Sequence, residues 1–223
     1  MALNALIFGA IGTLAETSDL QREAFNRAFR QSGLDWDWDA ATYQRLLQTP
    51  GGARRIADEA RSTGVMVDAA AVHSRKVANF RALVLERGIA LRPGVADTLA
   101  AARAAGLKLG WATSTNPQTV ALIREGLGQS LPADIFDHIG DSSDGRAPKP
   151  APDAYLRALS AMGVSADAAL AVEDTPESAT AALAAGLACI AFAGEAAALR
   201  QFPPGCIRVE ALSPALLHLK MAA

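Results

Sequence analysis

Residues 5–17 read ALIFGAIGTLAET, a short apolar run that leads into a glycine-containing turn. Four apolar residues before Gly9 predict a buried β-strand, and Gly12 marks the turn that follows. In an open parallel sheet, ligands bind outside the carboxyl ends of the strands. A reactive side chain is therefore expected at Gly9 or just after it. The residues there are Gly9, Ala10 and Ile11, and none of them carries a nucleophile or an ionisable group.

From about residue 90 onward, short apolar strands alternate with amphipathic helices. The stretch 92–128 predicts a helix, a strand and a second helix, with Asn116 or Thr115 as the N-cap of the second. The stretch 168–192 predicts strand, turn, helix and strand, with Thr175 as the helix cap. This alternation predicts an α/β fold, a Rossmann-like parallel sheet flanked by helices on both faces.

Residues 16–88 differ from the rest of the chain because they contain helical patterns and no convincing strand. Ser18 and Gln21 have the spacing of a capping box at the first helix. The expected helical segments are 17–33 and, approximately, 39–48, 52–62 and 68–87. A helical block inserted after the first strand predicts an all-helical cap domain over residues 16–88. The remaining residues, 1–15 and 89–223, form the predicted core domain.

Composition excludes several classes of protein. The chain has 223 residues, of which 51% are hydrophobic and 20% charged, so it can bury a sizeable core. A formal net charge of −2 argues against a nucleic-acid partner, which calls for a basic face. No Lys or Arg precedes Arg22, and no apolar run is long enough to cross a bilayer, so we expect no membrane partner. Cys189 and Cys206 lack CxxC spacing, which favours buried thiols and a cytoplasmic location.

Five polar residues fall at predicted carboxyl ends of strands or in the adjoining loops. Thr113 and Ser114 follow one strand, Glu173 and Asp174 end another, and Lys149 precedes a helix. Each residue alone has a structural explanation: the hydroxyls can satisfy backbone groups, the lysine can lie on the surface, and the acids can favour a helix start. Together, the hydroxyls and the lysine suit a phosphate, and the two carboxylates suit Mg²⁺. The sequence therefore predicts a phosphoryl site.

Other catalytic classes lack their motifs. The chain contains no GxGxxG sequence and no P-loop sequence, which disfavours a dinucleotide or nucleoside triphosphate. None of its three histidines has an acid and a nucleophile at convincing spacing, which disfavours a Ser/His/Asp hydrolase.

With these motifs, nearly the whole chain resembles the haloacid dehalogenase superfamily, in the branch of phosphoglycolate phosphatases and β-phosphoglucomutases. Residues 17–57 look closest to the cap of the sugar-bisphosphate phosphatases found in Calvin-cycle operons. The resemblance implies that Thr113 hydrogen-bonds the transferring phosphoryl group and that Lys149 is the family's lysine. It also implies that Glu173 and Asp174 are the acidic pair that carries Mg²⁺.

The first motif departs from this family. Its members carry Asp-x-Asp-Gly-Thr where this chain reads GAIGT at residues 9–13. The resemblance implies that the first aspartate is the nucleophile and a metal ligand, and that the second is the general acid/base. Gly9 and Ile11 stand at these positions, so no catalytic residue is intact there. Loss of a covalent nucleophile lowers turnover by roughly 10⁴ to 10⁶, and loss of a metal ligand predicts that Mg²⁺ binding is weakened or lost.

Three functions follow from this pattern. The first is a non-catalytic homologue of sugar-phosphate phosphatases that binds a phosphorylated small molecule, either a sugar phosphate or inorganic phosphate. The second is a Mg²⁺-dependent phosphomonoester hydrolase with low or unconventional activity, in which Glu16 or Asp19 replaces the missing acids. The third is a structural or interaction protein whose site is a relic.

Overall fold

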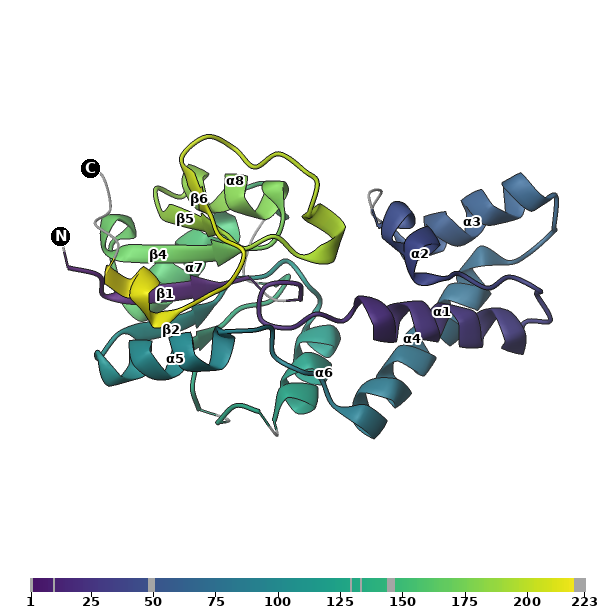
Figure 1. Cartoon of the computed structure of the whole chain (residues 1–223), viewed down its shortest axis with the longest axis horizontal. Helices are drawn as coiled ribbons and strands as arrows, with labels where there is room; N and C mark the ends of the chain where they lie inside the picture. Colours follow the sequence, from purple (N-terminus) through teal and green to yellow (C-terminus); the bar gives the residue numbers. More distant parts are fainter. Residues whose placement is uncertain are drawn as a thin grey trace. The chain divides into compact units, whose positions relative to one another are not determined.

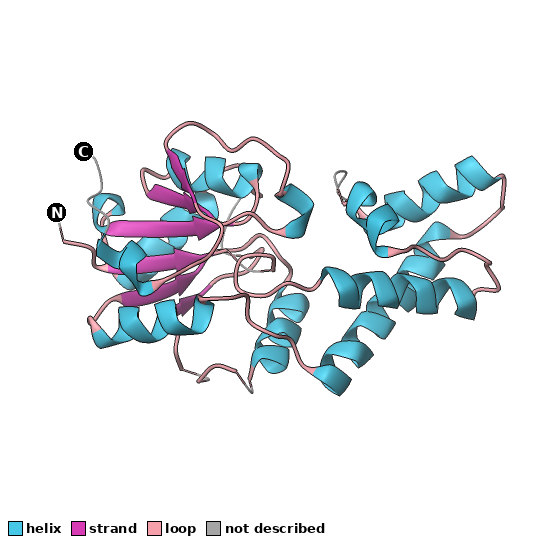
Figure 2. Cartoon of the chain, in the orientation of Figure 1, coloured by secondary structure: helices cyan, strands magenta, loops and turns pink. Residues whose placement is uncertain are grey.

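The larger part of the chain forms one parallel sheet flanked by helices (Figures 1 and 2). The structure is a computed structural model that describes residues 2–9, 11–47, 51–128, 130–132, 134–143 and 147–218. The sheet order is β3-β2-β1-β4-β5-β6. The strands are β1 (Ala5–Phe8), β2 (Lys108–Trp111), β3 (His138–Ile139), β4 (Ala169–Glu173), β5 (Ala188–Ala191) and β6 (Cys206–Arg208). The predicted Rossmann-like sheet is confirmed.

Strand β1 occupies the predicted residues and lies in the middle of the sheet. All four of its residues are buried, because helices cover both faces, and this explains why the strand is uniformly apolar. Phe8 is in register with Trp111 of β2 on one side and with Val172 of β4 on the other. The carboxyl ends of these three strands therefore meet at one edge of the sheet.

In the part of the chain that the structure describes, four α-helices flank the sheet: α5 (Val95–Ala104), α6 (Pro117–Leu127), α7 (Asp153–Met162) and α8 (Pro176–Ala184). Helices α7 and α8 pack on one face through a cluster that contains Tyr155, Ala181 and Cys189. From β1 through β2 to β3 the chain moves toward one edge of the sheet, and from β4 through β5 to β6 it moves toward the other. Right-handed crossovers therefore place α5 and α6 on the face opposite α7 and α8.

Two of the predicted helix caps are confirmed. The side chain of Asn116 accepts a hydrogen bond from the Thr119 amide at 2.9 Å, and that of Thr175 accepts one from the Ser178 amide at 3.3 Å.

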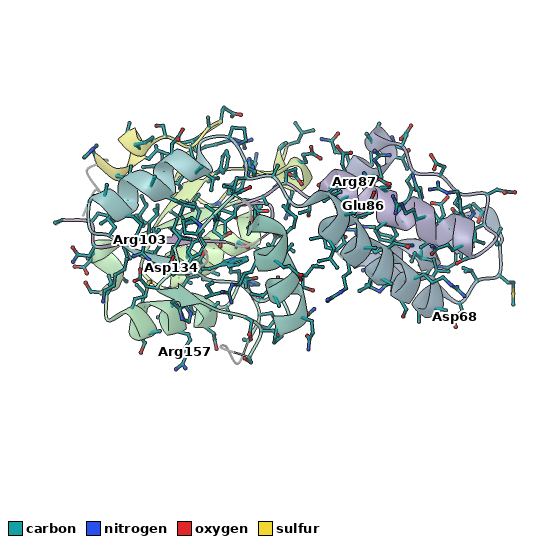
Figure 3. The ribbon with its side chains drawn as sticks, turned by 90° about the horizontal axis from the view of Figure 1, so that it is seen from below. Asp68, Glu86, Arg87, Arg103, Asp134 and Arg157 are labelled. Carbon is teal, nitrogen blue, oxygen red and sulfur yellow. The ribbon has the colours of Figure 1, made fainter. Side chains whose placement is uncertain are left out.

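Arg103, near the end of α5, donates a hydrogen bond to the backbone oxygen of Asp134 at 3.5 Å (Figure 3). This contact fastens the loop after α6 to α5.

Residues 17–88 contain four helices, as the sequence pattern indicates: α1 (Ser18–Gln31), α2 (Ala40–Leu46), α3 (Gly52–Thr63) and α4 (Ala69–Arg87). Figure 3 labels Asp68, the N-cap of α4, and Arg87, its last residue. Residue contacts divide the chain into two compact units, 1–16 with 89–223, and 17–88. No helix among the described residues is both long enough and apolar enough to span a bilayer.

The predicted capping box at the start of α1 is wrong. The N-cap is Thr17, which makes no side-chain cap hydrogen bond, and Gln21 does not turn back toward the helix start. The Gln21 side chain instead accepts a hydrogen bond from the ammonium group of Lys76. The free energy that a buried ammonium group would lose without a hydrogen-bond acceptor exceeds the free energy gained from a helix cap at the surface.

Candidate functional site

A cavity of about 320 Å³ lies where the carboxyl ends of β1, β2 and β4 meet. Its lining includes Ile11, Thr113, Ser114, Lys149, Glu173 and Asp174. The structure thus brings together the residues that the sequence predicts for a phosphoryl site, from four segments far apart in the chain. Their roles in binding remain predictions.

Glu173 is the centre of a buried polar network. Its side chain is fully buried, and Oε1 accepts hydrogen bonds from the Lys149 ammonium and the Tyr155 hydroxyl. Lys149 Nζ also donates to the Ala112 carbonyl oxygen at 3.0 Å. Burial, and then the neighbouring Glu173 carboxylate, raise the pKa of Tyr155 well above its usual value, so the phenol keeps its proton and donates it. The network neutralises a carboxylate that would otherwise be buried alone.

Asp174 has a different environment. Its Oδ1 accepts a hydrogen bond from Thr13 Oγ1 at 2.9 Å, whereas the same hydroxyl lies 3.5 Å from Glu173 Oε2. A threonine hydroxyl has one proton to donate, so the shorter contact assigns that proton to Asp174. Burial and the adjacent Glu173 charge raise the pKa of Asp174 to about 7.

The space beside Gly9 is filled by other side chains. A Cβ atom built on Gly9 would lie closer than 3.0 Å to Glu173 Oε2 and Thr13 Oγ1, a separation that real Cβ atoms essentially never show. The Gly9 amide donates to the Val172 carbonyl oxygen at 3.0 Å, which fixes the backbone there. A residue with a side chain fits at position 9 only if Glu173 and Thr13 move.

Gly12 is required for two reasons. Its φ of +88° lies in the left-handed region, which favours glycine. A Cβ at this position would also lie closer than 3.0 Å to the Asp174 carboxylate. Gly12 is therefore required by the turn after β1, and it is also the glycine of the GAIGT motif. The neighbouring Ile11 contributes only a hydrocarbon side chain to the cavity. Ala10 lies outside the described residues.

The two hydroxyl residues are already engaged with the backbone. Thr113 Oγ1 accepts from the Thr115 amide at 3.0 Å and donates to Thr115 Oγ1 at 2.9 Å. Ser114 Oγ accepts from the Lys149 amide at 3.1 Å. Because the Ser114 hydroxyl is an acceptor in this contact, its own proton is available to a ligand in the cavity.

Sequence reasoning missed three residues of this site. Thr13 stands in the sequence only as part of the GAIGT motif, and no motif includes Tyr155. Arg92 was not singled out; its guanidinium donates to the carbonyl oxygens of Gly12, Phe192 (2.9 Å) and Ala193 (2.7 Å). Arg92 thus connects the turn after β1 to the loop after β5. The sole signal for Tyr155 was its place six residues after Lys149 in the sequence.

The donor set of this cavity fits Mg²⁺ poorly. Mg²⁺ prefers oxygen ligands in octahedral geometry and usually takes one or two carboxylates. Glu173 has Lys149 and Tyr155 on one oxygen and Thr13 near the other, which leaves Asp174 as the carboxylate with fewer partners. The described part of the chain contains no cluster of three His, Cys, Asp or Glu side chains arranged to hold a metal.

The helical unit contains a separate group of basic side chains. Lys76 is 8% exposed, lies 4.9 Å from the Phe25 ring centroid, and has its pKa lowered to about 8, first by burial and then by Arg55. Burial, Lys76 and Arg55 also lower the pKa of His73. Lys76 and Arg55 supply the positive charge of this group within residues 17–88, whereas the lowered pKa of His73 favours its neutral imidazole.

Comparison with known proteins identifies the family. Residues 3–186 match the family of haloacid dehalogenase-like hydrolases. Protein CbbY of Cereibacter sphaeroides is 42% identical over 196 residues, which cover 86% of this chain and 85% of that protein. The crystal structure of CbbY from Rhodobacter sphaeroides in complex with phosphate matches with a TM-score of 0.75 at 37% identity, over 94% of each chain.

A mutant of the Rhodobacter sphaeroides protein, solved with xylulose-(1,5)bisphosphate, matches with a TM-score of 0.74 at 37% identity, again over 94% of each chain. The helices of residues 17–88 correspond to the cap of these structures. By sequence and by fold, the chain belongs to the haloacid dehalogenase-like hydrolase family.

Proposed function

We propose that this chain binds a phosphorylated small molecule in the cavity at the end of β1 and does not form an aspartyl-phosphate. The observation that carries the proposal is the filled space beside Gly9. Where the family's first motif has its nucleophile, the chain has no side chain, and the Glu173 carboxylate and the Thr13 hydroxyl occupy the adjacent volume. Glu173 is fully buried and neutralised by Lys149, which makes it a poor replacement for that nucleophile.

The cavity keeps groups that suit a phosphate. Lys149 supplies a positive charge and Ser114 a hydroxyl proton. Helix α8 begins beside Asp174, and its dipole favours negative charge at that end. Solved structures of the CbbY relative contain phosphate in one case and xylulose-(1,5)bisphosphate in another. A sugar phosphate or inorganic phosphate is the ligand class these features support.

We also propose that Mg²⁺ binding is weak or lost. In this family the ion would supply positive charge to a bound phosphoryl group, and here Glu173 and Asp174 are the carboxylates that would hold it. The Lys149 ammonium already compensates the Glu173 charge, and Gly9 provides no third carboxylate. Calorimetric titration with Mg²⁺, with and without phosphate, tests this proposal. We expect no detectable heat without phosphate, and micromolar affinity for the free ion contradicts the proposal.

A hydrolase with an unconventional group remains the competing function. Two acids that precede or begin the helical unit are poor candidates, because Glu16 accepts a hydrogen bond from the Glu195 amide at 3.3 Å and Asp19 pairs with Arg22 at 3.2 Å. Such an enzyme would have to use Glu173 or Asp174. Mg²⁺-dependent release of phosphate by the unmodified chain would establish this function in place of the proposed one.

Ligand binding is tested by thermal shift and calorimetry with inorganic phosphate and a panel of sugar phosphates. We expect stabilisation of the wild type and its loss in Lys149→Met. The matched control is Lys108→Met, which removes the same charge at the first residue of β2, the end of the sheet opposite the cavity. If no phosphate compound shifts the wild type, the chain is a structural or interaction protein and the proposal is wrong.

The domain assignment is part of this proposal. We assign residues 1–15 and 89–223 to a core domain that contains the cavity, and residues 16–88 to a cap that selects the ligand, in a cytoplasmic protein. The division of the chain into two compact units, 1–16 with 89–223 and 17–88, supports this assignment.

A further inference from the structure

The two cysteines of the chain lie directly opposite each other on neighbouring strands. Cys189 of β5 and Cys206 of β6 are register partners in a parallel pair. Paired strands run about 4.8 Å apart, and this falls within the Cα separation of about 4.4–6.8 Å at which disulfides form. Seventeen positions separate the two residues in sequence, so the arrangement is a product of the fold.

The two thiols differ in exposure and in acidity. Cys189 is buried in the cluster beneath α7 and α8, whereas Cys206 is half-buried on the last strand of the sheet, and both are free. The thiol of Cys189 donates a hydrogen bond to the Ile190 carbonyl oxygen at 3.6 Å. The neighbouring Cys206 and burial raise the pKa of the Cys189 thiol, whereas Cys189 lowers that of Cys206. Cys206 is therefore the more accessible sulfur and the one that an external disulfide reaches first.

Strand β6 can adjust to form a bond. It has three residues, pairs only with β5, and follows a loop anchored by a 3.4 Å hydrogen bond from the Cys206 amide to the Pro203 carbonyl oxygen. A disulfide requires the two Cβ atoms to approach to about 3.8 Å, closer than the strand spacing. An edge strand can make this small movement, whereas an interior strand is held on both sides.

We propose that Cys189 and Cys206 form a reversible thiol pair, which a small-molecule disulfide such as oxidised glutathione converts into an intramolecular disulfide between β5 and β6. This site is independent of the phosphate site proposed above. It lies on the last strand of the sheet, and nothing in the phosphate proposal uses either sulfur.

The reaction has two exchange steps. The Cys206 thiolate attacks one sulfur of the external disulfide, forms a mixed disulfide and releases one glutathione thiolate. The Cys189 sulfur then attacks the Cys206 sulfur, breaks the mixed disulfide and releases the second glutathione. The proton of Cys189 passes to that departing thiolate. Two protein thiols are oxidised by two electrons, and one external disulfide is reduced to two thiols.

The test exposes the full-length chain to oxidised glutathione under native conditions and measures its intact mass and disulfide peptides. We expect the wild type to lose the mass of two hydrogen atoms and to yield one peptide pair linking Cys189 to Cys206. Reduction with dithiothreitol should restore the starting mass. Amide hydrogen exchange in residues 206–208 should slow after oxidation, because the bond fastens β6 to the sheet.

Two variants identify the order of attack. Cys189→Ala should accumulate the glutathione adduct on Cys206, because no second sulfur remains to resolve it. Cys206→Ser should stay unmodified under the same conditions. The decisive result comes from the wild type, so poor folding of either variant does not affect it. A stable glutathione adduct on the wild type, or two unmodified thiols after exposure, overturns the proposal.

Discussion

The ion pair between Lys149 and Glu173 makes a sharp prediction about stability. Glu173 is fully buried and the Lys149 side chain is 10% exposed, so water screens the pair little. Lys149→Met removes the ammonium and leaves the Glu173 carboxylate with the Tyr155 hydroxyl as its hydrogen-bond donor. Breaking a buried pair by removing one partner costs about 3–5 kcal/mol. The remaining hydrogen bond from Tyr155 places the expected loss near the lower end, about 3 kcal/mol.

A double-mutant cycle isolates the pairwise part of this loss. Glu173→Gln keeps the shape of the side chain and removes its charge, and the double variant Lys149→Met with Glu173→Gln leaves no unpaired buried charge. We therefore expect the double variant to lose much less than the two single variants combined, with a coupling energy of about 2 kcal/mol. Urea denaturation followed by circular dichroism and tryptophan fluorescence measures each free energy of unfolding. A loss below about 1 kcal/mol for Lys149→Met, or simple additivity, refutes the reasoning.

Three further predictions follow from the same contacts. Gly12→Ala should cost about 1–3 kcal/mol of unfolding free energy, measured in urea, because the position has a positive φ and faces the Asp174 carboxylate; an unchanged midpoint contradicts this. The Lys76 pKa is lowered from 10.5 to about 8, so the unfolded chain binds more protons between these values and stability should rise with pH across that window. Lys76→Met should abolish this rise and stabilise the protein at pH 7 by at most about 3 kcal/mol, less the free energy of the lost hydrogen bond to Gln21. Denaturant midpoints measured from pH 7 to 10.5 test this prediction. If stability still rises with pH in Lys76→Met, a titratable group other than Lys76 causes the rise. Glu173→Gln should strengthen phosphate binding roughly tenfold in calorimetry. Removing a like charge at an assumed separation of about 5 Å is worth about 3 kcal/mol at an effective dielectric constant of 20, and the Lys149 ammonium already offsets part of it. Weaker binding would show that the anion does not lie beside Glu173.

Local sequence signals predicted the fold because they agree with its long-range contacts. The apolar run at residues 5–8 specifies a strand buried on both faces, and the structure places it between β2 and β4. Asn116 and Thr175 predict helix starts because a cap depends on residues three positions away. The predicted Ser18–Gln21 capping box is wrong because Gln21 makes a long-range contact. Its side chain accepts a hydrogen bond from Lys76, and no local sequence pattern indicates that Lys76 is buried.

The site shows the same limit. Residues at strand ends could be predicted to lie together, because parallel strands present their carboxyl ends at one edge. The hydrogen bond from Tyr155 to Glu173 and the three carbonyl contacts of Arg92 depend on packing between segments far apart in the chain. The sequence shows that positions 9 and 11 carry no acid, whereas only the structure shows that Glu173 and Thr13 fill the space beside Gly9.

The central claim is that the chain binds a phosphorylated molecule without hydrolysing it. Phosphate release from a panel of phosphomonoesters that includes a sugar bisphosphate, measured with Mg²⁺ present, tests this claim most directly. The double variant Gly9→Asp with Ile11→Asp serves as the comparison, since it restores both acids of the family's first motif. We predict no turnover above background for the unmodified chain and measurable Mg²⁺-dependent turnover for the double variant once Glu173 has moved aside. Substantial Mg²⁺-dependent turnover by the unmodified chain would contradict the account.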